Sequence, residues 1–206
     1  MTIVSYGDSD FQAVLRQLTQ RRAFPEHVEA SVADILKAVK ARGDDALVEY
    51  AKTFDKVDLT PDRFRVSQEE VEAAKASVDP ETVAAVQEAI ANVAEFAERQ
   101  KPQDWRFSPR EGVTLGERFM PLDRIGAYVP GGTAPLVSTV IHTCAIAKAA
   151  GVKEIVAVTP PGPKGEVLPE MLFAMDAAGV TEIYRLGGVY AIGALAYGTE
   201  TVRSVR

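Results

Sequence analysis

Metal ligands and disulfide-forming residues are scarce in this sequence. Its 206 residues include one cysteine, Cys144, and two histidines, His27 and His142. A single cysteine excludes an internal disulfide and fits the reducing cytoplasm, and two separated histidines do not make a structural zinc site. No apolar run approaches the ~20 residues that cross a membrane, and the first ten residues lack the pattern of a secretory signal. We therefore expect a cytoplasmic protein with no membrane partner and no metal site.

Basic residues are also in the minority. Lysine and arginine total 23 against 29 aspartates and glutamates, which gives a net charge of −6. Residues 26–100 carry 17 acids and 9 bases, whereas residues 124–206 carry 6 acids and 7 bases. No basic patch is visible, so we expect no nucleic-acid partner. The nearly neutral second half repels an anionic ligand less, although the G-x-G-x-x-G fingerprint and the Walker phosphate loop are both absent.

The first hundred residues have the spacing of helices. Helices are predicted over residues 9–22, from Pro25 to about residue 42, and over residues 46–54. Two further helices have start signals, which are Ser67 with Glu70 three residues later and Asp79 followed directly by a proline. The acidic residues at 69, 70 and 72 are typical of a solvated helix face.

The chain then changes to strands. Residues 113–119 alternate as in a strand, and residues 124–129 form a short apolar strand. The segment AAGVKEI at 149–155 recurs 28 residues later as AAGVTEI, and each copy predicts a helix end, a left-handed glycine and a strand. Strands over 155–159 and 183–186, with a helix over 167–178 between them, form a βαβ unit. The sequence therefore predicts an α/β fold with a parallel sheet covered by helices.

Three predicted strands end in proline and glycine. They are followed by Pro130, Gly131 and Gly132, by a second loop after Thr159, and by Gly187 and Gly188. Ligands bind beyond the carboxyl ends of parallel strands, and glycine lets backbone N–H groups approach an anion at a helix start. These loops favour a nucleotide or another phosphate-bearing ligand, although any loop between a strand and a helix needs similar residues.

Tyrosines accompany two of these loops. Tyr128 ends its strand, and Tyr190 opens the last helix, so each either contacts a ligand or packs in the core. Thr133 is either a helix cap or a phosphate contact, and Ser138 is a second candidate for phosphate. His142 is predicted to be a packed or partly exposed helical side chain, and Cys144 a small buried apolar one.

From Arg124 onward the residues resemble the histidinol dehydrogenase family. The segment IGAYVPGGTAP at 125–135 resembles the family's G-x-Y-[VI]-P-G-G-x-A/S. The GG at 187–188 and AIGALAYGT at 191–199 resemble its G-G-A-Q-A-I-A-A-L-A-Y-G-T segment. Earlier, RGDDAL at 42–47 matches a family helix, and the similarity covers nearly the whole chain.

The resemblance implies a zinc-dependent enzyme that oxidises L-histidinol to L-histidine with two NAD. It implies a homodimer and an incomplete Rossmann-like sheet, with residues 1–123 forming the helical region and part of a first α/β domain and residues 124–206 a second domain. Tyr128 matches the family tyrosine that contacts NAD, and the expected cofactor-binding set is Tyr128, Pro130, Gly131, Gly132, Gly187 and Gly188. Tyr190 occupies the position of the family's glutamine, another NAD contact.

The family's later motifs are missing. Family members are about twice as long, and their zinc ligands and Glu-His acid/base pair match no residue here. The resemblance therefore implies a truncated chain that is inactive alone and holds no catalytic or metal-binding residue. Two alternatives stay open: a non-catalytic α/β module that binds a nucleotide or a partner protein, and a small enzyme in which Tyr128, Tyr190 and His142 meet.

Overall fold

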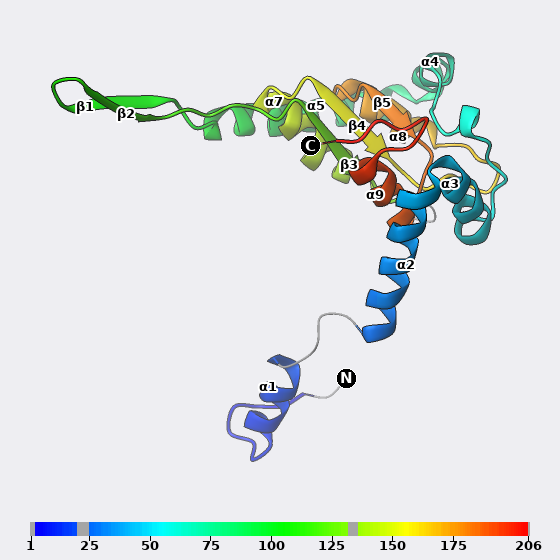
Figure 1. Ribbon diagram of the computed structural model, residues 1–206, viewed down its shortest axis with the longest axis horizontal. Helices are drawn as coiled ribbons and strands as arrows, with labels where there is room; N and C mark the ends of the chain where they lie inside the picture. Colours follow the sequence, from blue (N-terminus) through cyan, green and yellow to red (C-terminus); the bar gives the residue numbers. More distant parts are fainter. Residues whose placement is uncertain (1–2, 20–24, 132–135, 206) are drawn as a thin grey trace. The chain divides into compact units, whose positions relative to one another are not determined.

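A three-stranded parallel sheet organises the larger of the chain's two units, residues Ile35–Arg206. In this computed structural model, which describes residues 3–19, 25–131 and 136–205, the strand order is β3 (Arg124–Tyr128), β4 (Glu154–Val158) and β5 (Glu182–Tyr184). Both neighbouring pairs are parallel. The predicted α/β class and all three predicted strands are therefore confirmed (Figure 1).

Helices connect these strands and carry the predicted left-handed glycines. The β3–β4 connection contains α6 (Val137–Val140), the π-helix η3 (Ile141–Ala145) and α7 (Ile146–Ala150). The β4–β5 connection contains α8 (Pro169–Ala177). Gly151 follows α7 with φ +94°, and Gly179 follows α8 with φ +87°. The 28-residue repeat thus corresponds to two copies of the same turn from a helix into a strand, and each turn needs a residue that tolerates positive φ.

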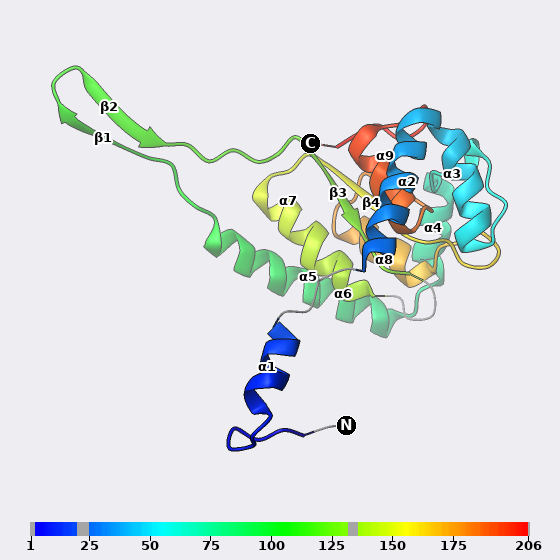
Figure 2. The same ribbon diagram turned by 60° about the horizontal axis from the view of Figure 1, so that its bottom comes forward.

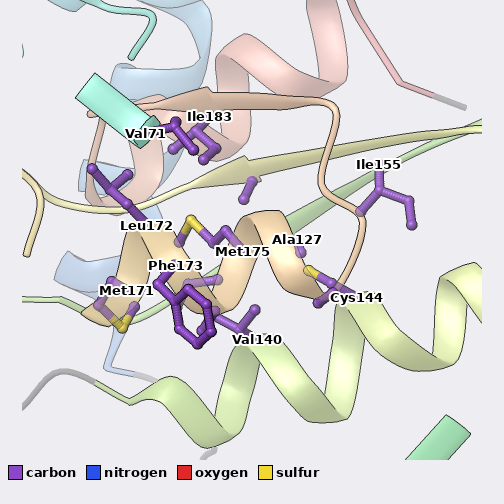
Figure 3. Close-up of a cluster of buried hydrophobic side chains, with 14 of the residues drawn as sticks. Val71, Ala127, Val140, Cys144, Ile155, Met171, Leu172, Phe173, Met175 and Ile183 are labelled. Carbon is purple, nitrogen blue, oxygen red and sulfur yellow. The ribbon is translucent and has the colours of Figure 1, made fainter. Parts of the chain in front are cut away.

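Two apolar cores lie on opposite faces of the sheet. Side chains alternate along β4, so Ile155 and Ala157 join one cluster, and Val156 and Val158 join the other. The first cluster packs α4 (Gln68–Ser77), α5 (Pro80–Gln100), α6, η3 and α8 against the sheet. Figure 3 shows side chains of this cluster from α4, α6, η3 and α8, Cys144 among them. The second cluster packs Ala46, Leu47 and the last helix, α9 (Gly188–Tyr197), on the other face. The sheet is therefore the middle layer of three.

The predicted start signals form helix caps. The side chain of Ser67 accepts a hydrogen bond from the N–H of Glu70, and the Glu70 carboxylate accepts one from the Ser67 N–H, at the start of α4 (Gln68–Ser77). Asp79 caps α5 (Pro80–Gln100) by accepting from the N–H of Thr82. The helix predicted over 46–54 is present as α3 (Asp44–Tyr50) continued by the π-helix η1 (Ala51–Asp55), and a short 3-10 turn, η2 (Pro61–Arg63), follows.

A hairpin that the sequence only half predicts follows α5. The strand expected over 113–119 is β2 (Val113–Glu117), and its antiparallel partner is β1 (Trp105–Arg110). Both strands are exposed nearly throughout, and Figure 2 shows the hairpin standing apart from the sheet. Since Trp105 and Phe107 stack on one another in the open, neither core holds this hairpin in place.

A single cation ties together the amino ends of the three strands. Arg124, 5% exposed, donates to both carboxylate oxygens of Glu182 at 2.8 and 2.9 Å and to Glu154 at 2.7 Å. These three residues begin β3, β4 and β5. Arg203 also pairs with Glu154, so two arginines balance two glutamates at this edge.

The smaller unit, residues Met1–Asp34, contains α1 (Phe11–Thr19) and the first part of α2 (Glu26–Arg42). The predicted helix end at residue 22 lies outside the described residues. Within the ranges that the structure describes, no helix has the length and apolar character needed to cross a membrane. The Rossmann-like detail and a domain boundary at residue 123 stay predictions.

Candidate functional site

The three predicted loops meet at the carboxyl edge of the sheet. The register pairs Tyr128 with Val158 and Val158 with Tyr184, so all three strands end side by side. A Cβ on Gly131 would lie 2.8 Å from Thr159 Oγ1, and a Cβ on Gly187 would lie 3.0 Å from Pro160. The glycines of the first and third loops therefore pack directly on the second loop, and a larger residue at either position would force the loops apart.

A cavity of about 490 Å³ opens beside the loop that follows β4. Its volume lies in the range of ordinary small-molecule sites. The walls are mostly apolar, with proline, valine, leucine and methionine side chains, and polar groups are few. The lining residues are Asp55, Lys56, Gly131, Thr159, Pro160, Pro161, Gly162, Pro163, Glu166, Val167, Leu168 and Met171.

A buried arginine, Arg185, contacts the loop after β4 that forms this wall. Arg185, 4% exposed, donates to the carbonyl of Gly165 at 3.0 Å and to the carboxylate of Glu70 at 2.5 Å. Glu70 is exposed, as predicted for this helix face, and its carboxylate also pairs with a cation 115 residues away. The hydrogen bond from Arg185 contributes to a pKa of Glu70 below its usual value, although burial opposes it.

Tyr190 lies inside the second core with its hydroxyl at the ligand edge. The side chain is 1% exposed, and its ring lies 6.1 Å from that of Tyr50. The hydroxyl donates to Asp55 Oδ2 and accepts from the N–H of Gly187 at 3.1 Å. Burial raises the pKa of Tyr190, and the neighbouring carboxylate raises it further. Tyr190 is thus a neutral bridge between the end of η1 and the Gly187 turn.

Tyr128 reaches the neighbouring amide of the same turn. Its hydroxyl accepts a hydrogen bond from the N–H of Gly188 at 3.3 Å. Two tyrosine oxygens therefore occupy two successive N–H groups at the start of α9. A ligand oxygen that binds the Gly188 N–H must displace the Tyr128 hydroxyl, which is a weak contact at this distance.

Asp55 is a site residue that sequence reasoning missed. It ends η1, is half-buried and lines the cavity. Burial raises its pKa above the usual value, while the hydrogen bond from Tyr190 opposes that rise. Nothing local marks this aspartate, because its partner Tyr190 lies 135 residues later in the chain.

The remaining candidates are placed as follows. Pro130 and Gly131 lie in the loop after β3, with Gly131 in the cavity wall, whereas Gly132 and Thr133 lie outside the described residues. Ser138 is exposed on α6. Cys144 is fully buried, as predicted, and burial raises its pKa.

His142 does not join the two tyrosines. It is exposed on η3, which covers the first core, whereas Tyr190 belongs to the second core on the other face of the sheet. The alternative that needs Tyr128, Tyr190 and His142 together is therefore wrong.

Comparisons with known proteins identify the family. The sequence model of the family named "Histidinol dehydrogenase" matches residues 18–206. The chain is 47% identical to histidinol dehydrogenase of Syntrophotalea carbinolica over 206 residues, which is 100% of this chain and 48% of that protein. It is 43% identical to the enzyme of Caulobacter vibrioides over 97% of this chain and 46% of that protein.

A solved structure agrees with these matches. The crystal structure of histidinol dehydrogenase from Elizabethkingia anophelis superposes with a TM-score of 0.84 at 37% identity, covering 94% of this chain and 44% of that one. The chain thus spans about half the length of the curated relatives it matches. On sequence and structure together, this chain belongs to the histidinol dehydrogenase family.

Proposed function

We propose that this chain supplies the cofactor-binding edge of a histidinol dehydrogenase, an NAD-dependent enzyme that oxidises L-histidinol to L-histidine. The family match over residues 18–206 carries the proposal. The geometry supports it, because a cavity of ligand size lies at the carboxyl edge of a parallel sheet, where nucleotides bind in such folds. The same proposal places the protein in the cytoplasm as a homodimer.

The proposed NAD contacts are Tyr128, Pro130, Gly131, Gly132, Gly187 and Gly188. When bound, NAD supplies the hydride acceptor for the oxidation. The apolar wall from Pro160 to Met171 would shield a flat ring of the cofactor from water. Tyr128 lies outside this wall, at the end of β3, and would offer a ring for stacking and a hydroxyl for hydrogen bonding. The Gly188 N–H at the start of α9 can donate to an uncharged oxygen of the cofactor once the Tyr128 hydroxyl turns away.

Zinc does not fit the described residues. Across residues 3–19, 25–131 and 136–205, no group of three or more His, Cys, Asp or Glu side chains is placed to hold a metal ion. The zinc of the family therefore has no ligand set in the part of the chain described, and the chain's own contribution to the reaction is to bind and orient the cofactor.

Calorimetric titration with NAD, with histidinol turnover assayed on the same sample, tests this function. We expect weak NAD binding, no turnover by the 206-residue chain, and no stoichiometric zinc. Tyr128→Ala removes both the ring and the hydroxyl and weakens binding by about tenfold. Ser108→Ala, on the exposed strand β1 and outside the cavity wall, serves as a control with unchanged affinity. Equal affinity of the Tyr128→Ala variant and the unchanged chain would remove Tyr128 from the site, and turnover would show that catalytic residues are present after all.

A further inference from the structure

The charged groups in the cavity wall differ in the hydrogen bonds that they already make within the protein. Lys56 Nζ donates to the carbonyl of Thr53 at 2.7 Å, within its own turn. Glu166 accepts from the Lys164 N–H at 2.8 Å, within its own loop. Each of these charges is held by the segment that carries it, so neither is aimed at a ligand.

Asp55 is different because its partner comes from across the fold. Its Oδ2 is taken by the hydroxyl of Tyr190. Its Oδ1 lies beside the Gly187 turn, 3.1 Å from where a Cβ on that glycine would stand. Among the described residues, no hydrogen bond to this second oxygen is present. A half-buried carboxylate therefore offers one unused acceptor at the rim of a mostly apolar cavity.

Tyr190 is held firmly enough to aim this carboxylate. Its ring is packed in the second core, and its hydroxyl sits between Asp55 and the Gly187 N–H. One side chain therefore fixes both the turn and the acid. The glutamine that the family resemblance places at this position has no ring to pack in the core, so the arrangement depends on the tyrosine of this chain.

We propose that Asp55 is a ligand-binding residue of the cavity and that Tyr190 is its positioning residue. Tyr190 holds one carboxylate oxygen, and the other accepts a hydrogen bond from a hydroxyl group of the ligand, such as a sugar diol. An ionised carboxylate only accepts hydrogen bonds, so it selects a hydroxyl-bearing part of the ligand and repels a phosphate. This inference rests on the proposed function, in which the ligand is NAD.

The test is NAD binding to the full 206-residue chain and four variants, with thermal unfolding recorded on the same samples. Tyr190→Phe removes the hydroxyl and keeps the ring, and Asp55→Ala removes the acceptor. Tyr184→Phe is the matched control, because Tyr184 is also buried in the second core and also donates to a carboxylate, Glu182, at the opposite edge of the sheet. The fourth variant combines Tyr190→Phe with Asp55→Ala.

We expect Tyr190→Phe and Asp55→Ala each to raise the Kd for NAD at least about tenfold, which is what losing a hydrogen bond to a charged group amounts to. The double variant binds no more weakly than Asp55→Ala, since the two residues act through one bond. Tyr184→Phe keeps the original Kd even where its unfolding midpoint falls. A purely structural tyrosine changes the midpoint and leaves the Kd of the folded protein alone.

Two results would overturn the inference, and they differ. If the unchanged chain binds NAD and Tyr190→Phe binds it equally well, the positioning role is wrong while the proposed function stands. If the unchanged chain binds no NAD at millimolar concentration, the proposed function fails and the inference fails with it. Should Tyr190→Phe not fold, Asp55→Ala alone decides, because Asp55 lies at the rim rather than in a core.

Discussion

Replacing Arg124 by methionine tests whether one buried cation holds the amino ends of the sheet together. The Arg124 side chain is 6% exposed, and those of Glu182 and Glu154 are 18% and 40% exposed. Removing one partner of a buried pair costs about 3–5 kcal/mol. Because both glutamates keep some solvent, the expected loss lies at the lower end, about 3 kcal/mol.

Urea unfolding followed by circular dichroism at pH 7 measures this loss. Tryptophan fluorescence is a poor probe here, because Trp105 lies on the exposed hairpin. The matched control is Arg99→Met, which removes an exposed pair with Glu95 on α5 and costs less than about 1 kcal/mol.

The difference between Arg124→Met and the unchanged chain must also depend on pH. The hydrogen bond from Arg124 lowers the pKa of Glu182 below its usual value. Because the pKa of Glu182 is lower in the folded state than in the unfolded chain, its ionised form stabilises the fold at pH values above the unfolded pKa of about 4.3. This contribution is lost as the pH falls through the folded-state pKa. The difference therefore shrinks below pH 4. A loss no larger than that of Arg99→Met, or one that stays constant down to pH 3, would refute a buried ion-pair clamp.

Two further variants test the site and the core. Asp55→Asn should raise the thermal unfolding midpoint at pH 7, because burial raises the pKa of Asp55 and so disfavours its ionised form in the folded state. The gain should shrink towards pH 4, and a gain that grows towards acid pH in the thermal scans would contradict this reasoning. Met175→Ala empties a fully buried position in the first core and should cost about 2–5 kcal/mol in urea unfolding. A loss below 1 kcal/mol would mean that the helices around α8 collapse into the space.

Local chemistry explains which features the sequence predicts. The capping box of Ser67 and the cap by Asp79 involve partners three residues apart, so they can be read directly. The glycines of the repeat likewise follow from the left-handed backbone that ends a helix. The parallel sheet then follows from two strands joined by a helix of suitable length.

Long-range pairs explain what the sequence does not predict. Asp55 meets Tyr190, and Glu70 meets Arg185, across more than 100 residues. No spacing rule links such positions, because only the packing of the second core and of α4 brings them together. The hairpin partner strand β1 is not predicted for another reason: all six of its residues are exposed, and Pro109 interrupts the short alternation of Trp105 and Phe107 with polar residues.

The burial of both faces of β4 affects how the register of the parallel strands is determined. Residues 155–158 read Ile-Val-Ala-Val, so a one-residue slip would still place a small aliphatic side chain on each face. Hydrophobicity alone therefore distinguishes poorly between the observed register of β4 and a register shifted by one residue. The charges at the start of the strands do distinguish them, because a slip would carry Glu154 away from Arg124 and leave a buried guanidinium without one of its acceptors. The ion cluster at the amino edge of the sheet thus favours the register in which the loops at the carboxyl edge meet.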